Sequence, residues 1–272
     1  MSTLEAIVLG LVQGLTEFLP ISSSGHLRIV PAFLGWEDPG ASFTAVIQLG
    51  TMAAVLVYFR HDLMSIARAW VRELHVPWAR RSSDSKLGWF ILLGTIPISI
   101  FGFAFSDQIE SGARDLYLIG TALIAFALVM LAAERYGKHS RKLEAMTPRD
   151  GVFIGFAQAL ALVPGVSRSG ATISAGLLRN FDRDAAARYS FLLSVPAVVL
   201  SGLYGLRDIG GPGDNASVAA TIIATLAAFA SGYAAISWLL HYLHNHSLAI
   251  FVAYRIPLGI VVIALAASGA IS

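Results

Sequence analysis

The sequence predicts an all-α integral membrane protein with six transmembrane helices and two re-entrant helical hairpins, arranged as an inverted-topology repeat. Three observations predict this fold: the composition, two interrupted apolar segments, and the distribution of basic residues. Of 272 residues, 56% are hydrophobic and 13% are charged, whereas a soluble domain carries about 25% charged residues. Lipid is therefore the expected solvent of the folded chain. Because cysteine is absent, disulfide and thiolate chemistry are excluded.

Six apolar stretches are long enough to cross a hydrocarbon core, which needs roughly 20 helical residues. They are Ala41–Phe59, Leu87–Phe105, Leu116–Ala133, Tyr189–Leu206, Val218–Leu240 and Leu248–Ala267. Several contain glycine or proline, which transmembrane helices tolerate. These stretches predict a multi-pass protein.

Two further apolar stretches are shorter and end in proline, glycine and serine. Ala6–Leu19 contains Glu17 and continues into a polar segment that ends at His26, and Val152–Val163 continues into Pro164–Gly170. A half-length helix, a break and a second short apolar piece are typical of a re-entrant hairpin. Broken backbone survives at membrane depth only where protein or a wet cavity satisfies its polar groups. Each break therefore predicts a site.

The two interrupted segments are related by a shift of 145 residues. Six of the sixteen positions 10–25 are identical after this shift, where roughly one or two are expected by chance. Gly10, Gln13, Leu15, Ser22, Ser24 and Gly25 correspond to Gly155, Gln158, Leu160, Ser167, Ser169 and Gly170. We therefore expect one membrane domain made of two repeats, residues 1–145 and 146–272, each with a hairpin followed by three spans. Because three is odd, the second repeat enters the membrane inverted.

The basic residues between the spans predict the orientation in the membrane. Fourteen lysines and arginines lie in the alternate segments 60–86, 135–149 and 179–188, whereas the other connections hold three, Arg28, Arg114 and Arg207. By the positive-inside rule, the three basic segments face the cytoplasm and both termini face outside. The two hairpins then enter from opposite sides, and their tips are expected to meet near the midplane.

Two charged residues lie at these breaks. Burying the ionised carboxylate of Glu17 costs at least about 2.5 kcal/mol, and intramembrane acids are functional by default. Arg168 lies between Gly165 and Gly170, where close backbone N–H groups, a helix N-terminus and a guanidinium suit a phosphate. Two structural alternatives stay open: neighbouring hydroxyls that satisfy Glu17, and a Glu17–Arg168 ion pair that holds no ligand.

The hydroxyl groups and the imidazole of the first break suit phosphate chemistry. His26 is interpreted as a general acid or base, the alternative being a satisfied polar residue. Ser22, Ser23 and Ser24 are candidate phosphate contacts, although at least one of them is expected to be a helix cap. The 145-residue shift aligns Ser23 with Arg168, so that one repeat has a hydroxyl at the position where the other has a cation.

We expect the substrate to be bound by hydroxyl and glycine positions of both breaks. These positions are Ser22, Ser24, Gly25, Gly165, Ser167, Ser169, Gly170 and Thr172. Arg255, in the last predicted span, is either a residue that reaches the interface or a second phosphate contact. A polar turn is predicted at His241, His244 and His246 rather than a metal site, because the sequence shows no acidic residue near them.

At these motifs the sequence resembles the bacterial undecaprenyl-diphosphate phosphatase family, also called the bacitracin-resistance protein family. The segments that carry the resemblance are Gln13–His26 and Pro164–Thr172, with Phe43–Gly50 and Ser190–Pro196 also similar, and it covers nearly the whole chain. The resemblance implies a hydrolase of the bacterial plasma membrane that converts undecaprenyl diphosphate to undecaprenyl phosphate. The resemblance implies that this reaction recycles the lipid carrier for peptidoglycan and other cell-wall polymers. The family also implies a divalent cation and an active site open to the outer face.

Carried over position by position, the resemblance gives catalytic roles to Glu17, Ser23, His26 and Arg168. Gln13 stands where many members have a second glutamate, so the expected ligands of a Mg²⁺ or Ca²⁺ ion are Glu17 and the neutral Gln13. In the resulting hypothesis, Ser23 is activated by His26 and attacks the terminal phosphorus. Attack by a water molecule that His26 activates stays open as an alternative.

A second function class also fits this pattern. Inverted repeats whose broken helices meet at the midplane are typical of secondary transporters, so a transporter or flippase for a lipid phosphate is the alternative function. The pair Ser23 and His26 favours the phosphatase, because a carrier needs no nucleophile. The expected partners are a polyprenyl diphosphate and membrane lipids. A homodimer stays open, and no nucleic acid is expected.

Overall fold

The structure is a computed structural model that describes residues 1–106, 108, 115–205 and 217–271. The described residues form helices and one isolated β-bridge, between Arg141 and Phe181. The predicted all-α class is therefore confirmed. The predicted span Tyr189–Leu206 ends at a residue outside the described part of the chain.

The first half of the chain contributes α1 (Thr3–Phe18), α2 (Ser23–Leu34), α3 (Gly40–Tyr58), α4 (Arg60–Arg72), α5 (Ser83–Ala104) and α7 (Leu116–Tyr136). The second half contributes α8 (Pro148–Ala159), α9 (Arg168–Leu178), α10 (Arg183–Gly205), α11 (Val218–Asn245) and α12 (Ala249–Ala267). Three short 3₁₀ helices, η1 (Trp78–Arg80), η2 (Leu143–Ala145) and η3 (Leu160–Leu162), lie in the connections.

Among the described residues, four helices, α5, α7, α11 and α12, are long and apolar enough to cross a membrane. Helices α3 and α4 count as a fifth candidate when taken together, although they meet at an angle of 74°. Helix α10 is not among the candidates, and its first turns carry Arg183, Asp184 and Arg188. The chain is therefore a multi-pass helical membrane protein.

The two predicted hairpins are pairs of short helices. Helix α1 ends at Phe18, two residues before Pro20, and α2 begins after the first break, Leu19–Ser22. Helix α8 and the single turn η3 are followed by the second break, Val163–Ser167, and then by α9. Proline disfavours helical geometry in the residue before it, and the proline of each break therefore helps to end the helix before it.

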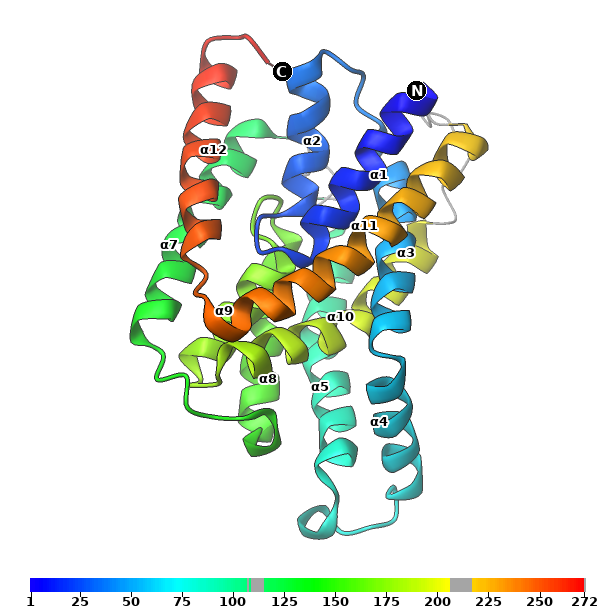
Figure 1. Ribbon diagram of the computed structural model, residues 1–272, viewed down its shortest axis with the longest axis vertical. Helices are drawn as coiled ribbons and strands as arrows, with labels where there is room; N and C mark the ends of the chain where they lie inside the picture. The colour runs from blue at the N-terminus through cyan, green and yellow to red at the C-terminus, as the bar shows by residue number, and fades with distance from the viewer. Residues whose placement is uncertain (107, 109–114, 206–216, 272) are drawn as a thin grey trace.

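Each hairpin packs against a long helix of the opposite half (Figure 1). Helix α1 lies along α11, and α8 lies along α5, while α7 pairs with α12 and α3 packs against both α11 and α10. Two glycines related by the 145-residue shift permit the first two contacts. A Cβ atom at Gly10 would lie 2.3 Å from the carbonyl oxygen of Ala224, and one at Gly155 would lie 2.6 Å from the Cα of Gly94. Glycine is required at both positions because the helix backbones touch there.

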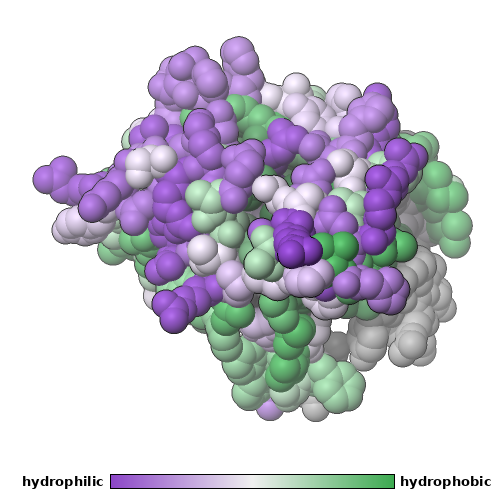
Figure 2. Space-filling view, turned by 90° about the horizontal axis from the view of Figure 1, so that it is seen from below, coloured by the Kyte–Doolittle hydropathy of each residue, from purple (hydrophilic) through white to green (hydrophobic). Residues whose placement is uncertain are grey.

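The two termini lie at one end of the molecule, and the α4–α5 and α7–α8 connections lie toward the other (Figure 1). These connections belong to the basic segments 60–86 and 135–149. Figure 2 looks onto this second end and shows hydrophilic side chains gathered across it. The basic segments 60–86 and 135–149 therefore lie toward the end of the fold that is opposite the termini.

Candidate active site

The N-termini of α2 and α9 meet where the two hairpins touch. Helix α2 begins at Ser23 and α9 begins at Arg168, and the capping residues before them, Ser22 and Ser167, have φ angles of 75° and 69°. The hydroxyl of each cap accepts a hydrogen bond from the N–H of the glycine three residues later, at 3.4 and 3.2 Å. First-turn N–H groups and the helix dipole make such N-termini favourable for an anion. The two breaks therefore share one local structure and bring two such helix starts together.

Glu17 lies at the centre of this meeting point and accepts four hydrogen bonds. One carboxylate oxygen, Oε2, accepts from the side-chain amide of Gln13 at 3.0 Å and from the Ser23 hydroxyl at 2.6 Å. The other, Oε1, accepts from the side-chain amide of Gln48 at 3.1 Å and from Arg168 at 2.5 Å. The carboxylate is buried, with 4% of its side chain exposed. It is therefore saturated with donors from four different helices.

Arg168 links the second hairpin to the first. Its Nη2 pairs with Glu17, and its Nη1 donates to the carbonyl of Ser194 at 3.3 Å. The Arg168 side chain is 13% exposed, more than the side chain of its partner Glu17. The ion pair that the sequence left open as a structural alternative is thus present, and its more accessible end is the cation.

The serines of the breaks mostly hold the backbone in place. The hydroxyls of Ser22 and Ser24 lie 3.3 Å apart, and those of Ser167 and Ser169 lie 3.2 Å apart. Ser169 also donates to the carbonyl of Leu19 at 3.1 Å, which joins the two breaks directly. Of the serines predicted to contact the substrate, Ser22 and Ser167 therefore serve as helix caps.

The remaining predicted contacts are also occupied by protein groups. The Thr172 hydroxyl lies 2.6 Å from that of Ser190 and 2.8 Å from the Arg168 carbonyl. The N–H groups of Gly25 and Gly170 donate to the caps. A Cβ at Gly165 would lie 2.6 Å from the Ile119 carbonyl oxygen, and the φ angle there is 92°. Both the lack of space and the positive φ therefore require glycine at this position.

His26 is buried beside the first break, and hydrogen bonds engage both of its ring nitrogens. Nδ1 lies 2.7 Å from the Ser22 carbonyl oxygen, and Nε2 lies 2.7 Å from the hydroxyl of Tyr254 on α12. The Ser23 hydroxyl points instead to Glu17. The structure therefore does not pair His26 with Ser23, and the group that accepts a hydrogen bond from the Ser23 hydroxyl is the Glu17 carboxylate.

Arg255 fulfils neither of the two roles that the sequence left open. It is fully buried and donates to main-chain carbonyls, among them Pro20 of the first break and Gly165 and Val166 of the second. It also donates to Leu123 on α7 at 3.1 Å. Carbonyls freed by broken helices need donors at membrane depth. Arg255 supplies them to both breaks at once and so fixes their relative position.

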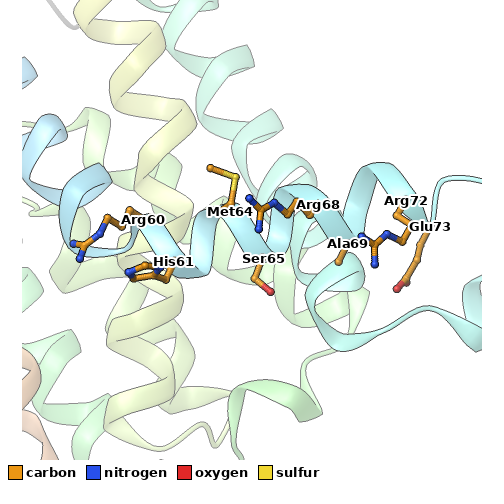
Figure 3. A pocket seen from close by; sticks show the side chains of 8 residues that line it. All are labelled: Arg60, His61, Met64, Ser65, Arg68, Ala69, Arg72 and Glu73. Carbon is orange, nitrogen blue, oxygen red and sulfur yellow. The ribbon is translucent and has the colours of Figure 1, made fainter.

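The polar turn predicted at the three histidines is wrong for two of them, because His241 and His244 lie in the last turns of α11 and only His246 follows that helix. An acidic residue also lies near them, because His244 is 2.9 Å from Asp184 at the start of α10. That carboxylate is 60 positions away along the chain, which is why the sequence did not reveal it. A separate groove of about 530 Å³ runs along α4, with Arg60, Arg68 and Arg72 among its lining side chains (Figure 3). None of its lining residues bonds Glu17 or Arg168, so this groove is not part of the site.

A divalent cation fits the meeting point only in part. Within the described ranges, no group of three or more His, Cys, Asp or Glu side chains could hold a metal ion. Glu17 offers one carboxylate, and Gln13 and Gln48, whose amide nitrogens donate to it, keep their amide oxygens as further ligands. Mg²⁺ is often held by one or two carboxylates together with substrate phosphates. The residues therefore fit an ion that is shared with a bound diphosphate.

Two residues of this site were missed by the sequence analysis. Gln48 is an amide within the apolar stretch of α3, and Tyr254 precedes the buried arginine of α12. The polar side chain of Gln48 within a predicted span was a usable signal. Tyr254 gave no such signal in the sequence, because tyrosine is common in transmembrane helices near the interface.

Comparison with known proteins identifies relatives along the whole chain. Residues 6–261 match the family described as bacitracin resistance protein BacA. The chain is 53% identical over 272 residues to the undecaprenyl-diphosphatase of Thermobifida fusca, which covers 100% of this chain and 93% of the relative. It is also 53% identical to the undecaprenyl-diphosphatases of Nocardioides sp. (99% of this chain and 98% of the relative) and Mycolicibacterium smegmatis (100% and 99%). These matches confirm the resemblance found at the two motifs.

Proposed function

The chain belongs to the bacitracin resistance protein BacA family, and we propose that the meeting point of its hairpins hydrolyses undecaprenyl diphosphate to undecaprenyl phosphate and inorganic phosphate. The protein is an undecaprenyl-diphosphatase of the membrane. Its product is the lipid carrier of cell-wall synthesis, and recycling that carrier confers bacitracin resistance. The observation that carries the proposed site is the hydrogen bond of 2.6 Å from Ser23 to a carboxylate that also pairs with Arg168.

Arg168 is the proposed diphosphate-binding residue. A guanidinium binds phosphate oxygens in a bidentate manner, and the helix start of α9 adds first-turn N–H groups beside it. Because Nη2 of Arg168 is paired with Glu17, we expect a diphosphate that binds the guanidinium in a bidentate manner to replace that carboxylate as its partner. Substrate binding would then release one Glu17 oxygen at the moment when the reaction needs a base. The ion pair of the free enzyme is thus compatible with catalysis.

Ser23 is the proposed nucleophile and Glu17 its base. The Ser23 oxygen forms a bond to the terminal phosphorus while its proton passes to Glu17, and the bond from phosphorus to the bridging oxygen breaks. Undecaprenyl phosphate leaves, and Glu17 gives the proton to solvent. A water molecule then attacks the phosphoserine, and its proton returns through Glu17 to the Ser23 oxygen as phosphate departs. Splitting one displacement into two is the general advantage of a covalent intermediate.

A divalent cation is proposed as the cofactor. The carboxylate of Glu17 and the amide oxygens of Gln13 and Gln48 would hold it, together with the substrate. When bound, Mg²⁺ or Ca²⁺ would neutralise charge on the phosphate oxygens. Since one neutral amide stands where many family members have a carboxylate, we expect the ion to bind weakly before the substrate arrives. Phosphate release should therefore stop on addition of a chelator.

We also propose the finer topology: six spans, with α10 as one of them, two re-entrant hairpins, and two inverted repeats that meet at Glu17 and Arg168. The reciprocal packing of α1 on α11 and α8 on α5 supports the repeat. The end that carries the basic segments 60–86 and 135–149, viewed in Figure 2, would face the cytoplasm. Both termini would face outside, and the site would open to the outer face. In intact cells, an impermeant thiol reagent should modify Ala270→Cys and spare Ser83→Cys. The reverse pattern would contradict this orientation.

The assay of the function is phosphate release from undecaprenyl diphosphate by the purified protein in detergent. Arg168→Lys should lower the rate strongly, because a point charge cannot reproduce the bidentate contact. Arg188→Lys is the matched control, since Arg188 pairs with Asp62 outside the site. A lipid-phosphate carrier would release no phosphate, would move lipid across proteoliposomes, and would overturn the proposal.

A further inference from the structure

The residue next to the buried arginine of α12 contacts the active-site histidine. The Tyr254 hydroxyl lies 2.7 Å from His26 Nε2, and the two rings are stacked with centroids 5.6 Å apart and planes 12° from parallel. These residues are 228 positions apart in the chain. The contact belongs to the fold of the site rather than to local sequence.

The hydrogen-bond partners of His26 determine which of its nitrogens carries the proton. The partner of Nδ1 is the Ser22 carbonyl, which can only accept a hydrogen bond, so Nδ1 must be the donor. In the neutral imidazole Nε2 is then an acceptor, and the Tyr254 hydroxyl must donate to it. The tyrosine and the carbonyl together select one tautomer and one ring orientation.

The position of Tyr254 is itself fixed by its neighbour. Arg255 donates to carbonyls of both breaks, so the turn of α12 that carries Tyr254 cannot move independently of them. Tyr254 is 44% exposed, whereas His26 is 6% exposed. The tyrosine ring that stacks on the imidazole is therefore the more exposed member of the pair.

We propose that Tyr254 is a positioning residue of the phosphatase, which acts through His26 and not on the substrate. It holds the imidazole in the Nδ1–H tautomer against the Ser22 carbonyl and thereby fixes the residue that precedes the nucleophile Ser23. The consequence for the mechanism is specific. His26 has no nitrogen left for the Ser23 proton, and its contribution to turnover depends on the tyrosine hydroxyl. The expected effect of Tyr254 on turnover rests on the proposed function, whereas its effect on the tautomer of His26 does not.

The kinetic test compares Tyr254→Phe with the parent in the phosphate-release assay. Phenylalanine keeps the stacked ring and removes the hydroxyl alone. By analogy with partners that orient metal-bound histidines, we expect kcat to fall by about 10- to 100-fold, with KM for undecaprenyl diphosphate unchanged. Tyr233→Phe is the matched control, because Tyr233 is similarly exposed and contacts Tyr58 through its ring. An unchanged kcat, or a loss expressed through KM, would overturn the proposal.

A double mutant separates action through His26 from direct action. In a His26→Ala background, Tyr254→Phe should have no further effect on kcat, since residues that act as one unit are not additive. A full, multiplicative loss would show that Tyr254 acts on the reaction without His26 and would contradict the inference. If the parent itself released no phosphate, the proposed function would fail, and the next measurement would still test the tautomer.

Nitrogen NMR of protein labelled at histidine reports the tautomer directly. The signals of His26 are identified as those missing from His26→Gln. In the parent we expect a protonated Nδ1 and an unprotonated Nε2, and in Tyr254→Phe a shifted Nε2 signal or a mixture of tautomers. A parent in which Nε2 carries the proton of the neutral ring would overturn the inference, whatever the activity.

Discussion

Replacing Glu17 by glutamine perturbs both the stability and the chemistry of the site. The carboxylate accepts hydrogen bonds from Gln13, Ser23, Gln48 and Arg168. A glutamine keeps one accepting oxygen but turns an NH₂ group, which can only donate, toward two of these donors. It also leaves Arg168 without its counter-ion.

The structure allows the size of this effect to be worked out. Removing one partner of a buried ion pair destabilises a protein by about 3–5 kcal/mol, and the partial exposure of Arg168 favours the lower value. With about 2–4 °C lost per kcal/mol in chains near this size, the melting temperature should fall by about 6–12 °C. A buried carboxylate without partners would instead lose no stability when it is neutralised, because burying its charge is costly.

Thermal unfolding in detergent, followed by circular dichroism, measures this shift. Arg168→Met should also destabilise, and the Glu17→Gln/Arg168→Met double mutant should be less destabilised than the sum of the singles, since the two residues are in contact. Glu134→Gln removes the partner of Arg183 away from the site, so it should lose stability but keep turnover. A Glu17→Gln protein that melts within about 2 °C of the parent would refute the ion pair. One that also kept full turnover would remove Glu17 from the mechanism.

Three further changes test other parts of the structure. Arg255→Met should abolish the yield of folded, monodisperse protein, because the carbonyls of both breaks lose a buried donor; normal yield and melting temperature would contradict this. Burial raises the pKa of Asp150, but hydrogen bonds from Arg141 and Arg179 outweigh it and hold the pKa well below the ordinary value. The stability that this carboxylate contributes is present above about pH 4 and lost at lower pH. The melting temperature of Asp150→Asn should therefore lie well below that of the parent at pH 7 and approach it below pH 4. A difference in melting temperature that does not depend on pH would exclude the charge as the cause. Gln13→Glu should lower the Mg²⁺ concentration that gives half-maximal phosphate release, because a carboxylate is a stronger ligand for a hard cation, and an unchanged concentration would exclude position 13 as a ligand.

Local patterns predicted the two breaks and most of the helices, but not α4, which lies in a segment predicted to be a basic connection. Apolar stretches interrupted by proline, glycine and serine predicted both hairpins, and the 145-residue shift placed Ser23 opposite Arg168. In the structure these residues are the first residues of α2 and α9, and both bond Glu17. Repeat symmetry was informative because equivalent breaks adopt the same cap geometry.

Contacts between distant segments could not be predicted in the same way. Glu17 and Arg168 are 151 positions apart, and His26 and Tyr254 are 228 apart. Proximity in sequence suggested that His26 activates Ser23, but helix α2 directs the imidazole to the Ser22 carbonyl and the hydroxyl to Glu17. The role of Arg255 was likewise undetermined, because its partners are main-chain carbonyls, which no side-chain pattern reveals.

The rate of phosphate release by Ser23→Ala, compared with its neighbour Ser24→Ala, tests the central claim most directly. The hydroxyl of Ser23 bonds the carboxylate of Glu17, whereas that of Ser24 bonds the cap Ser22. The proposed mechanism predicts that Ser23→Ala loses at least about 100-fold in kcat and that Ser24→Ala stays near the parent, with both proteins folded. A Ser23→Ala enzyme that retained most of the parental rate would contradict the covalent mechanism and make water the attacking group.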